Sequence, residues 1–550
     1  MIEQLLADAP TAVRIVADGR SHDARRAAAR RWQADGAEVA LRGEGPPSVH
    51  LTADGVPVEE VVLRWRTDAF SSPANVYGDE WERGYGALMW QPVVPERVLP
   101  WYFLAASGGA PAGDGATARV LAAGVGVAPA ALASWRVDAA GLTLVLDVRN
   151  GSVGVELAGR ELELARVCAK TYEGSSTFAA ARDFAGLLAG GRGLNPSEPV
   201  YGGNNWYYAY GESSRDEILA DSRLVAELAP GAGPAGGAAT AATAEGSNRP
   251  FMVIDDGWQL CRWPGFNGGP WVPNERFGDM AELAAAMRET GVRPGIWTRP
   301  LLTCAADAAS LAFPDRGLGP DAMWDGVILD PSRPGTLERI AGETARIAEW
   351  GYELVKHDFT TYDVFGQWGF QMGRRPAAGA WSFADRSRTS AEIIRELYAT
   401  IRRAAPEALI IGCNAVGHLA VGEVHLQRTG DDTSGREWER TRKMGINTLA
   451  FRAHQHDAFF AVDADCVGLT RKVPWEKNRQ WLDLLARSGT PLFVSAAPDA
   501  MGDDQRRAVA DAFARAAAPR PLGEPLDWMH TTCPSRWRFG EETIDYDWFE

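Results

Sequence analysis

The chain has 550 residues, more than one compact hydrophobic core accommodates, so two or three domains are expected. Lys and Arg number 56 against 72 Asp and Glu, and the formal net charge of −16 argues against nucleic acid or an anionic membrane surface as a partner. No apolar run reaches transmembrane length, and the N-terminal residues carry an early acid, unlike a secretory signal. We therefore expect a soluble, cytoplasmic protein.

Cysteine and tryptophan usage narrows the class further. The six cysteines are scattered, with no Cys-x-x-Cys pair and no neighbouring histidine cluster, so neither a zinc site nor a disulfide framework is predicted. Twenty-one tryptophans are unusually many for this length. Their faces can stack on sugar rings, which favours a carbohydrate ligand, although by composition alone core packing is the commoner reason for a tryptophan.

The first part of the chain has a β pattern. Up to about residue 185, short runs with apolar alternation, such as 141–149 and 152–157, are separated by Gly, Pro, Asn and Asp clusters. This pattern predicts an antiparallel β-sandwich, which we assign to residues 1–196. Two Gly/Ala/Pro-rich stretches, around 106–115 and 122–133, are predicted to be loops. No catalytic motif occurs in this part.

From Pro199 onwards, apolar strand-like runs alternate with helical segments. The expected strands are 201–210, 250–258, 293–299, 352–359, 408–413, 425–428, a run near 458–462, and 491–495. The expected helices are 215–228, 280–290, 335–350, 390–404, 476–487 and 505–517, with 229–247 as a linker. The fold class is therefore α/β: a (β/α)₈ TIM barrel over residues 197–520 after the β-sandwich, followed by a short C-terminal β segment over 521–550.

The strand 352–359 ends in an unusual pair of charges. Strand side chains alternate, so Lys356 and Asp358 point to one side and His357 to the other. A buried cation and carboxylate at the carboxyl end of a barrel strand are costly unless they serve a site, and barrel active sites lie at that end. A structural ion pair is the alternative, and this strand alone does not decide between the two.

Other strand ends carry similar groups. Asp255 and Asp256 follow the second strand, and such adjacent acids need donors, which the hydroxyls of a sugar would supply. Trp206 and Trp297, at the ends of the first and third strands, are placed to wall a pocket, although core packing is equally expected for each alone.

The sixth strand ends in Arg428-Thr-Gly-Asp-Asp432, so Asp358 faces carboxylates across the mouth of the barrel. Two carboxyl groups that flank a bond are the equipment for glycoside hydrolysis. One is a nucleophile, kept ionised here by Lys356, and the other is an acid with a raised pKa that protonates the leaving oxygen.

The motifs resemble the α-galactosidase clan of glycoside hydrolases, most closely family 36. The matching motifs, in order, are Gly202-Gly-Asn-Asn-Trp206, Asp255-Asp256, Lys356-His-Asp358-Phe359, Gly412-Cys413, Arg428 followed by Asp432, and an altered Val462-Asp-Ala-Asp-Cys466. The departures are Gly203, Asn204 and Asn205 in place of the family's usual Trp, Cys and Ser, and a much shorter C-terminal β segment.

The resemblance implies an α-galactosidase-like, retaining glycoside hydrolase that cleaves terminal α-linked galactose. It implies Asp358 as nucleophile and Asp432, rather than Asp431, as acid/base. It also implies sugar contacts from Asp255, Asp256, Trp206, Trp297, Lys356, Cys413 and Arg428.

Two alternatives stay open: a raffinose-synthase-like transglycosidase and a non-catalytic carbohydrate-binding barrel. Neither a metal nor a cofactor is implied, and the lack of strand-end histidine pairs counts against a metal-dependent hydrolase. The expected partner is a carbohydrate substrate, and no oligomeric state is predicted.

Overall fold

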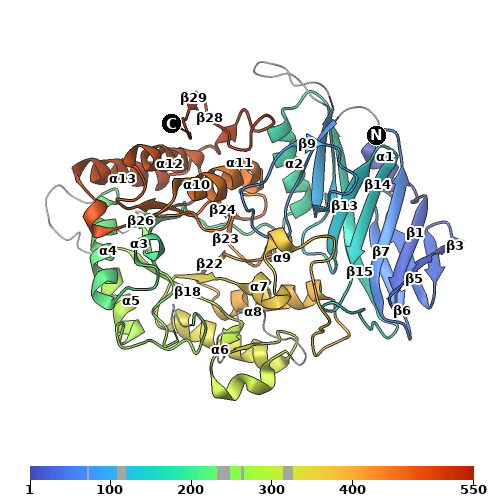
Figure 1. The fold of residues 1–550 in the computed structure, drawn as a ribbon, viewed down its shortest axis with the longest axis horizontal. Helices are drawn as coiled ribbons and strands as arrows, with labels where there is room; N and C mark the ends of the chain where they lie inside the picture. The colour runs from blue at the N-terminus through green and yellow to red at the C-terminus, as the bar shows by residue number, and fades with distance from the viewer. Residues whose placement is uncertain (71–73, 108–118, 232–247, 262–265, 314–325, 550) are drawn as a thin grey trace.

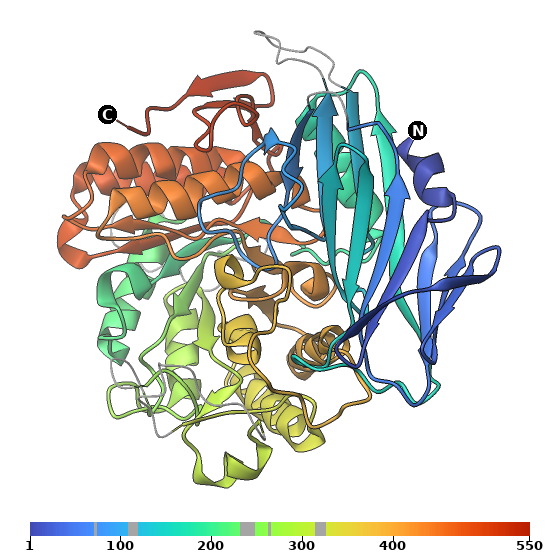
Figure 2. The ribbon, with the colours of Figure 1, turned by 45° about the vertical axis from the view of Figure 1, so that its right-hand side comes forward.

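The computed structural model describes residues 1–70, 74–107, 119–231, 248–261, 266–313 and 326–549. Two β-sheets built from the N-terminal residues stand beside a larger α/β part that contains most of the rest of the chain (Figure 1). Turned by 45°, the ribbon shows the two parts in broad contact along one side (Figure 2).

The N-terminal strands form two antiparallel sheets. Within the described residues, one sheet has the order β10-β13-β14-β7-β1-β2 and the other β3-β4-β5-β6-β15-β12-β11-β8-β9. The first contains β1 (Ala12–Ala17), β2 (Arg20–Asp23), β7 (Val58–Arg66), β10 (Leu99–Pro100), β13 (Leu132–Asp138) and β14 (Gly141–Asp147). The second contains β3 (Arg25–Ala28), β4 (Arg31–Ala34), β5 (Ala37–Arg42), β6 (Ser48–Ala53), β8 (Ala74–Gly78), β9 (Gln91–Pro92), β11 (Tyr102–Ser107), β12 (Arg119–Val125) and β15 (Glu161–Tyr172). Buried side chains such as Phe103 and Trp135, from different sheets, pack together with ring centroids 5.8 Å apart, as in a β-sandwich.

One expectation for this part is wrong, and another, the loop at 122–133, holds only for residues 126–131. The β pattern does not continue to residue 185, because Thr177–Ala189 form helix α2 and Ser176 caps it by accepting from the Ala179 N–H. A short helix, α1 (Ile2–Ala7), also precedes the first strand.

The predicted loop 122–133 is strand at both ends, in β12 and β13. Its small residues reflect close packing: a Cβ on Gly124 would come within 2.6 Å of Tyr102 Cβ. Most of the other predicted loop, 108–115, lies outside the described residues.

The α/β part is organised around one sheet in which every pairing is parallel. Its order in the described chain is β24-β23-β22-β21-β18-β17-β16-β26-β25. The strands are β16 (Tyr201–Asn204), β17 (Phe251–Ile254), β18 (Arg293–Thr298), β21 (Leu354–His357), β22 (Leu409–Gly412), β23 (Leu426–Arg428), β24 (Ala461–Asp463), β25 (Cys466–Leu469) and β26 (Leu492–Ala496). The two end strands are separated in sequence only by Ala464 and Asp465, so the sheet curves round in a TIM-barrel-like manner.

The long helices agree with the sequence analysis to within two residues at each end. They are α4 (Arg215–Leu228), α5 (Met280–Glu289), α6 (Pro334–Glu349), α8 (Ser390–Ala404), α12 (Trp475–Ser488) and α13 (Asp503–Ala516), and they lie on the outside of the sheet (Figure 1). Shorter elements complete this part: α3 (Trp206–Ala209), α7 (Thr360–Phe365), α9 (Gly417–Ala420), α10 (Trp438–Thr441), α11 (Thr448–Arg452), β19 (Leu302–Thr303) and β20 (Val327–Ile328). Most of the predicted linker, 232–247, lies outside the described residues.

The first barrel strand is shorter than predicted. It ends at Asn204, whose side-chain Oδ1 accepts from the Trp206 N–H at 2.7 Å, and Trp206 begins α3. Asparagine side chains commonly reverse the chain by bonding a backbone group two residues on. Trp206 is therefore carried on a short helix above the strand end.

The C-terminal residues link the two parts of the molecule. The predicted short β segment contains β27 (Glu524–Pro525), β28 (Arg536–Phe539) and β29 (Glu542–Asp545), which form one small antiparallel sheet. Trp528 packs against Tyr77 and Phe178 of the N-terminal part and Phe451 of α11, with ring centroids 5.6–5.7 Å apart. The tail thus adds apolar contact at the boundary between the sandwich and the barrel.

The absence of a disulfide framework was expected, yet Cys261 and Cys304 are joined in a disulfide. Cys168, Cys413, Cys466 and Cys533 are free and buried. None of the helices in the described part of the chain combines the length and apolar character needed to cross a membrane.

Candidate active site

A cavity of about 440 Å³ opens at the carboxyl ends of the parallel strands. Its wall brings together residues from strand ends that are far apart in sequence. They are Arg83, Trp206, Tyr210, Asp255, Asp256, Asn267, Trp297, Lys356, Asp358, Phe359, Trp368, Asp431, Asp432, Arg436 and Arg440. Seven of the nine predicted site residues, all but Cys413 and Arg428, are therefore in one cavity.

Lys356 pairs with Asp255 rather than with Asp358. Its Nζ lies 2.7 Å from Asp255 Oδ2, and Asn204 donates to the same oxygen at 2.7 Å. Burial alone would lower the pKa of Lys356, but the Asp255 carboxylate raises it well above the ordinary lysine value. The long side chain reaches from β21 to the end of β17, so the lysine neutralises an acid two strands away. The expectation that Lys356 is the counter-ion of Asp358 is corrected accordingly.

Asp358 is held by neutral donors. The Trp297 indole donates to Oδ2 at 3.2 Å, and the Phe359 N–H donates to Oδ1 at 2.7 Å. Phe359 has φ 59°, in the left-handed region, where the chain turns from β21 into α7. Such backbone strain persists only where the surroundings over-determine it, and it concentrates at functional sites. The turn fixes the carboxylate at the cavity wall.

The two acids after β23 have different surroundings. Asp431 accepts from Arg83 through Oδ1 at 2.8 Å and from Arg440 through Oδ2 at 2.7 Å, so both of its oxygens are engaged. Asp432 has one ion pair, with Arg428 at 3.3 Å, and its side chain is 34% exposed. Asp432 is therefore the acid of the pair that is free to meet a ligand.

Two cavity carboxyl groups have shifted pKa values in opposite directions. For Asp432, burial favours the protonated form, but Arg428, Arg83, Lys356 and Arg440 outweigh burial and lower the pKa to about 2. This differs from the expected raised pKa, because the sequence did not reveal how many cations surround the group. For Asp256, burial and the neighbouring Asp255 charge prevail over the Gln259 hydrogen bond, and the pKa rises to about 7.

Cys413 and Arg428 are not among the residues that line the cavity. Both are almost completely buried, and the Cys413 Sγ is 3.4 Å from an Arg428 guanidinium nitrogen. Arg428 also bonds Asp465 at 2.8 Å, and Asp465 lies between β24 and β25. The predicted sugar contacts of these two residues stay predictions. His357 faces the other way and packs near Tyr398 of α8, with ring centroids 5.6 Å apart.

Several wall residues were not identified from the sequence. Trp368 stacks on Tyr362 at 4.4 Å, and Tyr210 lies 3.8 Å from the Arg436 guanidinium. Loop aromatics soon after a barrel strand, as in Gly366-Gln-Trp368, were the available indication. Arg83 comes from the N-terminal part, where no motif marked it, because its proximity to the barrel arises only through folding.

The described residues therefore form a TIM-barrel-like sheet whose strand ends gather carboxylates and tryptophans, next to antiparallel sheets packed as in a β-sandwich. Among solved structures, the chain is similar to the α-galactosidase TtGalA from Thermus thermophilus in complex with p-nitrophenyl α-D-galactopyranoside. That match has a TM-score of 0.61 and 20% identity and covers 98% of this chain and 99% of the other. The family 36 α-galactosidase AgaA from Geobacillus stearothermophilus matches with a TM-score of 0.62 and 14% identity, over 92% of this chain and 71% of the other.

AgaB from the same organism matches with a TM-score of 0.60 and 12% identity, over 92% of this chain and 74% of the other. No family model matches the sequence. The resemblance to family 36 is thus confirmed at the level of the fold. Sequence identities of 12–20% do not show which reaction the chain catalyses, so the reaction has to be inferred from the residues of the site.

Proposed function

We propose that the protein is a retaining glycoside hydrolase that removes terminal α-linked galactose from oligosaccharides or other glycosides, on a (β/α)₈ barrel. The observation that carries this proposal is that Asp358 and Asp432 line the same cavity from the ends of β21 and β23. Two carboxyl groups that flank a bond suffice for glycoside cleavage without a metal or cofactor.

In the first step, Asp358 attacks the anomeric carbon while the bond to the leaving oxygen breaks, and Asp432 gives its proton to that oxygen. A covalent galactosyl-enzyme results. In the second step, Asp432 takes a proton from water as the water oxygen attacks the anomeric carbon and releases Asp358. Two inversions give net retention.

The remaining residues bind the sugar. Asp255 and Asp256 accept bonds from hydroxyl groups, and the Lys356 ammonium donates to one while it stays paired with Asp255. Trp206 and Trp297 form the walls. Cys413 and Arg428 support the floor, where Arg428 also orients Asp432. The choice of galactose rests on structural relatives: TtGalA structures contain p-nitrophenyl α-D-galactopyranoside or stachyose, and a variant of AgaA contains raffinose.

Transfer to a second sugar is the competing outcome of the same intermediate. Two aromatic pairs line the cavity, Trp206–Tyr210 at 5.5 Å and Phe359–Trp368 at 5.6 Å, and such faces fit an acceptor ring. A transglycosidase would form more transfer product than free galactose at high acceptor concentration. A non-catalytic barrel would form neither.

The test is a panel of p-nitrophenyl glycosides, with the α-galactoside first, on the wild type, Asp358→Ala and Asp221→Asn. Asp221 is a buried acid of α4 that does not line this cavity, so its variant is the matched control. We expect Asp358→Ala to lower kcat by at least about 10³-fold, with the control near wild type. Unchanged turnover in Asp358→Ala would sink the nucleophile assignment. If the protein cleaves another α-glycoside but not the α-galactoside, the proposed mechanism stands and galactose is rejected as the substrate sugar.

A further inference from the structure

A segment of the N-terminal part reaches into the barrel mouth. Residues 79–90 connect β8 to β9, and in Figure 2 this blue loop leaves the sandwich and lies against the α/β part. Arg83 is the member of this segment that lines the cavity. The sandwich is therefore a contributor to the candidate site.

The backbone of this segment pairs with the end of β23. The Gly84 N–H donates to the Thr429 carbonyl at 2.8 Å, and the Asp431 N–H donates to the Gly84 carbonyl at 3.0 Å. Gly84 and Gly430 form a parallel bridge. A Cβ on Gly84 would lie 3.0 Å from Thr448 Cγ2, so the approach leaves little room for a side chain. The chain immediately before Asp432 is thus hydrogen-bonded to the sandwich.

The side chain of Arg83 adds a second connection between the N-terminal part and the loop that contains Asp432. It is 5% exposed, bonds Asp431 at 2.8 Å, and lies over the Trp368 ring at 5.2 Å. Trp368 belongs to the loop that follows β21, the strand that presents Asp358. One guanidinium therefore contacts both the loop of the proposed nucleophile and the loop of the proposed acid/base.

Glu82 makes a second link of the same kind. Its Oε1 accepts from the Gly369 N–H at 2.7 Å, and its Oε2 accepts from Asn414, which follows β22. The Tyr85 hydroxyl also donates to Glu82. Glu82, Arg83 and Gly84 thus bond to the loops that follow three barrel strands, β21, β22 and β23.

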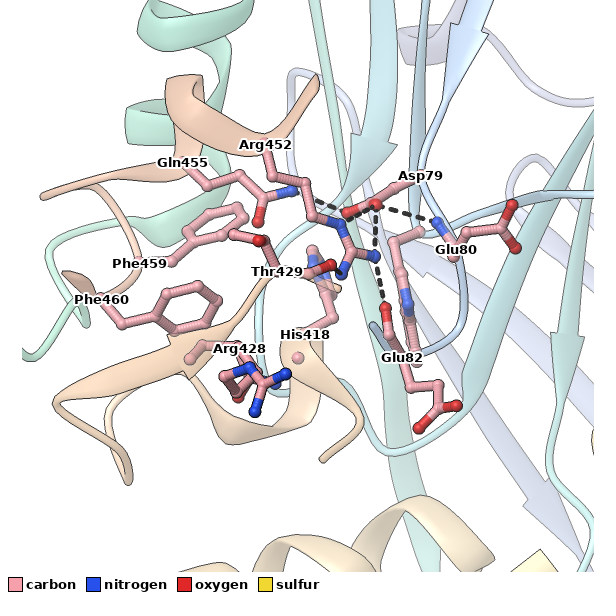
Figure 3. Close-up of a pocket in the computed structure, with 13 residues that line it drawn as sticks. Asp79, Glu80, Glu82, His418, Arg428, Thr429, Arg452, Gln455, Phe459 and Phe460 are labelled. Carbon is pink, nitrogen blue, oxygen red and sulfur yellow. Dashed lines mark hydrogen bonds and ion pairs between the residues drawn. The ribbon is translucent and has the colours of Figure 1, made fainter. Parts of the chain in front are cut away.

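The segment itself is anchored behind the cavity. Arg452 donates to Asp79 Oδ1 at 2.7 and 2.8 Å, to the Thr429 carbonyl at 2.9 Å and to the Glu82 carbonyl, and Gln455 donates to Asp79 Oδ2 at 2.7 Å. Figure 3 shows Arg452 between Asp79, Thr429 and Glu82. These groups are buried, so a rigid base supports the start of the segment.

We propose that Arg83 is a positioning residue through which the N-terminal domain holds the Asp432 loop against the Asp358 loop. The inference rests on the proposed function, because the spacing of two carboxyl groups determines how a glycosidase acts. Arg83 also contributes positive charge near Asp432. The other charged or titratable groups that face Asp432 are Asp431, Arg428 and Arg440 nearby in sequence, and Lys356 and Tyr207 from other elements.

The test compares Arg83→Met, Arg83→Lys and Arg160→Met. Arg160 is the matched control: it is an N-terminal arginine that bonds a barrel carboxylate, Glu392, at 2.8 Å, and it does not line the cavity. The substrates are raffinose, whose leaving group needs protonation, and p-nitrophenyl α-D-galactopyranoside, whose leaving group does not.

For Arg83→Met we expect kcat/KM on raffinose to fall about 100-fold, because Asp432 is no longer held in place beside the leaving oxygen, and kcat/KM on the aryl galactoside to fall less than about tenfold. The larger protonated fraction of Asp432 in this variant offsets only part of the loss on raffinose. Removal of a cation raises the pKa of a nearby carboxyl group, so the Asp432 titration, followed by carbon-13 NMR and assigned with Asp432→Asn, moves to higher pH. Arg83→Lys keeps that titration in place and loses less raffinose activity. Arg160→Met behaves as wild type.

Equal losses on both substrates with an unmoved Asp432 titration would overturn the proposal and leave Arg83 a structural residue. If Arg83→Met does not fold, the substrate ratio in Asp431→Asn decides, because that variant cuts the same link from the barrel side. There the Asp432 titration should move to lower pH, because a neighbouring negative charge is removed while Arg83 stays. A wild type inert on every α-galactoside would refute the proposed function instead, and the NMR titration would still test Arg83.

Discussion

The Lys356 ammonium and the Asp255 carboxylate are joined across the barrel interior, 2.7 Å apart and both nearly buried. The pair lies close to Asp358, which directly follows the strand of the lysine, so one cation pairs with a proposed sugar-binding acid and lies near the proposed nucleophile. Removal of one member of a buried pair leaves a charge that water cannot reach.

Lys356→Met should therefore lower the free energy of unfolding by about 3–5 kcal/mol, because Asp255 is left buried without its ion-pair partner. The double variant Lys356→Met/Asp255→Asn should recover most of that stability while remaining inactive. Urea denaturation of the wild type, Lys356→Met and the double variant measures both effects. A single variant as stable as wild type would show that the pair does not hold Asp255 in solution.

The low pKa of Asp432 predicts an acidic optimum. As the proposed general acid, Asp432 must carry a proton in the first step, and the surrounding arginines and Lys356 lower its pKa to about 2. The protonated fraction falls as pH rises above that value, so kcat/KM for raffinose should be highest below neutrality and decline towards alkaline pH. Rate measurements from pH 3 to pH 9 test this. An optimum above about pH 8 would contradict Asp432 as the acid.

The raised pKa of Asp256 predicts that sugar affinity depends on pH. With a pKa of about 7, the group is protonated in mildly acidic solution and accepts hydroxyl bonds less well. The Kd for galactose should rise by up to about tenfold for each pH unit below 7 and level off above it. Calorimetric titrations measure Kd, and Asp256→Asn should remove the dependence.

Asp221→Asn is the matched control for this effect. Its pKa is also raised to about 7, by burial, and it bonds Tyr208 away from the cavity wall. The pH dependence of galactose binding should survive in this variant. Its loss there would assign the effect to the fold as a whole rather than to Asp256.

The cluster around Arg452 predicts that the sandwich and the barrel unfold together. Arg452→Met would leave Asp79 buried without its ion pair and remove the bonds to Thr429 and Glu82. We expect a loss of about 3–5 kcal/mol in the free energy of unfolding. Wild type should show a single calorimetric transition. Two separated transitions in the wild type would contradict tight coupling of the two parts.

Chelation should leave activity unchanged. No group of three or more His, Cys, Asp or Glu suited to hold a metal ion occurs among the described residues, and the proposed chemistry uses carboxyl groups alone. Incubation with EDTA followed by the p-nitrophenyl assay measures this. Loss of activity that added Mg²⁺ or Zn²⁺ restores would favour a metal-assisted reaction.

Local sequence patterns were sufficient for much of the fold. The bounds of helices such as α4 and α8 agree with the stretch over which apolar residues recur at helical spacing. The alternation of strands and helices also predicted that Asp255, Asp358 and Asp432 follow parallel strands. Helix α2 was missed although Glu173-Gly-Ser-Ser176 separates it from β15 and Ser176 caps it, because this stretch was assigned to the β pattern that precedes it. The Gly/Ala stretch around 122–133 was taken for a loop, because small residues mark both loops and close-packed strands.

By itself, the sequence determined which acids, tryptophans and basic residues stand at the ends of the parallel strands, because strand alternation and βα order are local properties. Only the tertiary structure decided which charges meet. Lys356 pairs with Asp255 instead of Asp358, and Arg83, which belongs to the N-terminal part, forms an ion pair with Asp431. Pairing of charges depends on side-chain reach and on contacts between distant segments, so the long-range packing sets the electrostatics of Asp432 and Asp256 that strand order alone leaves open.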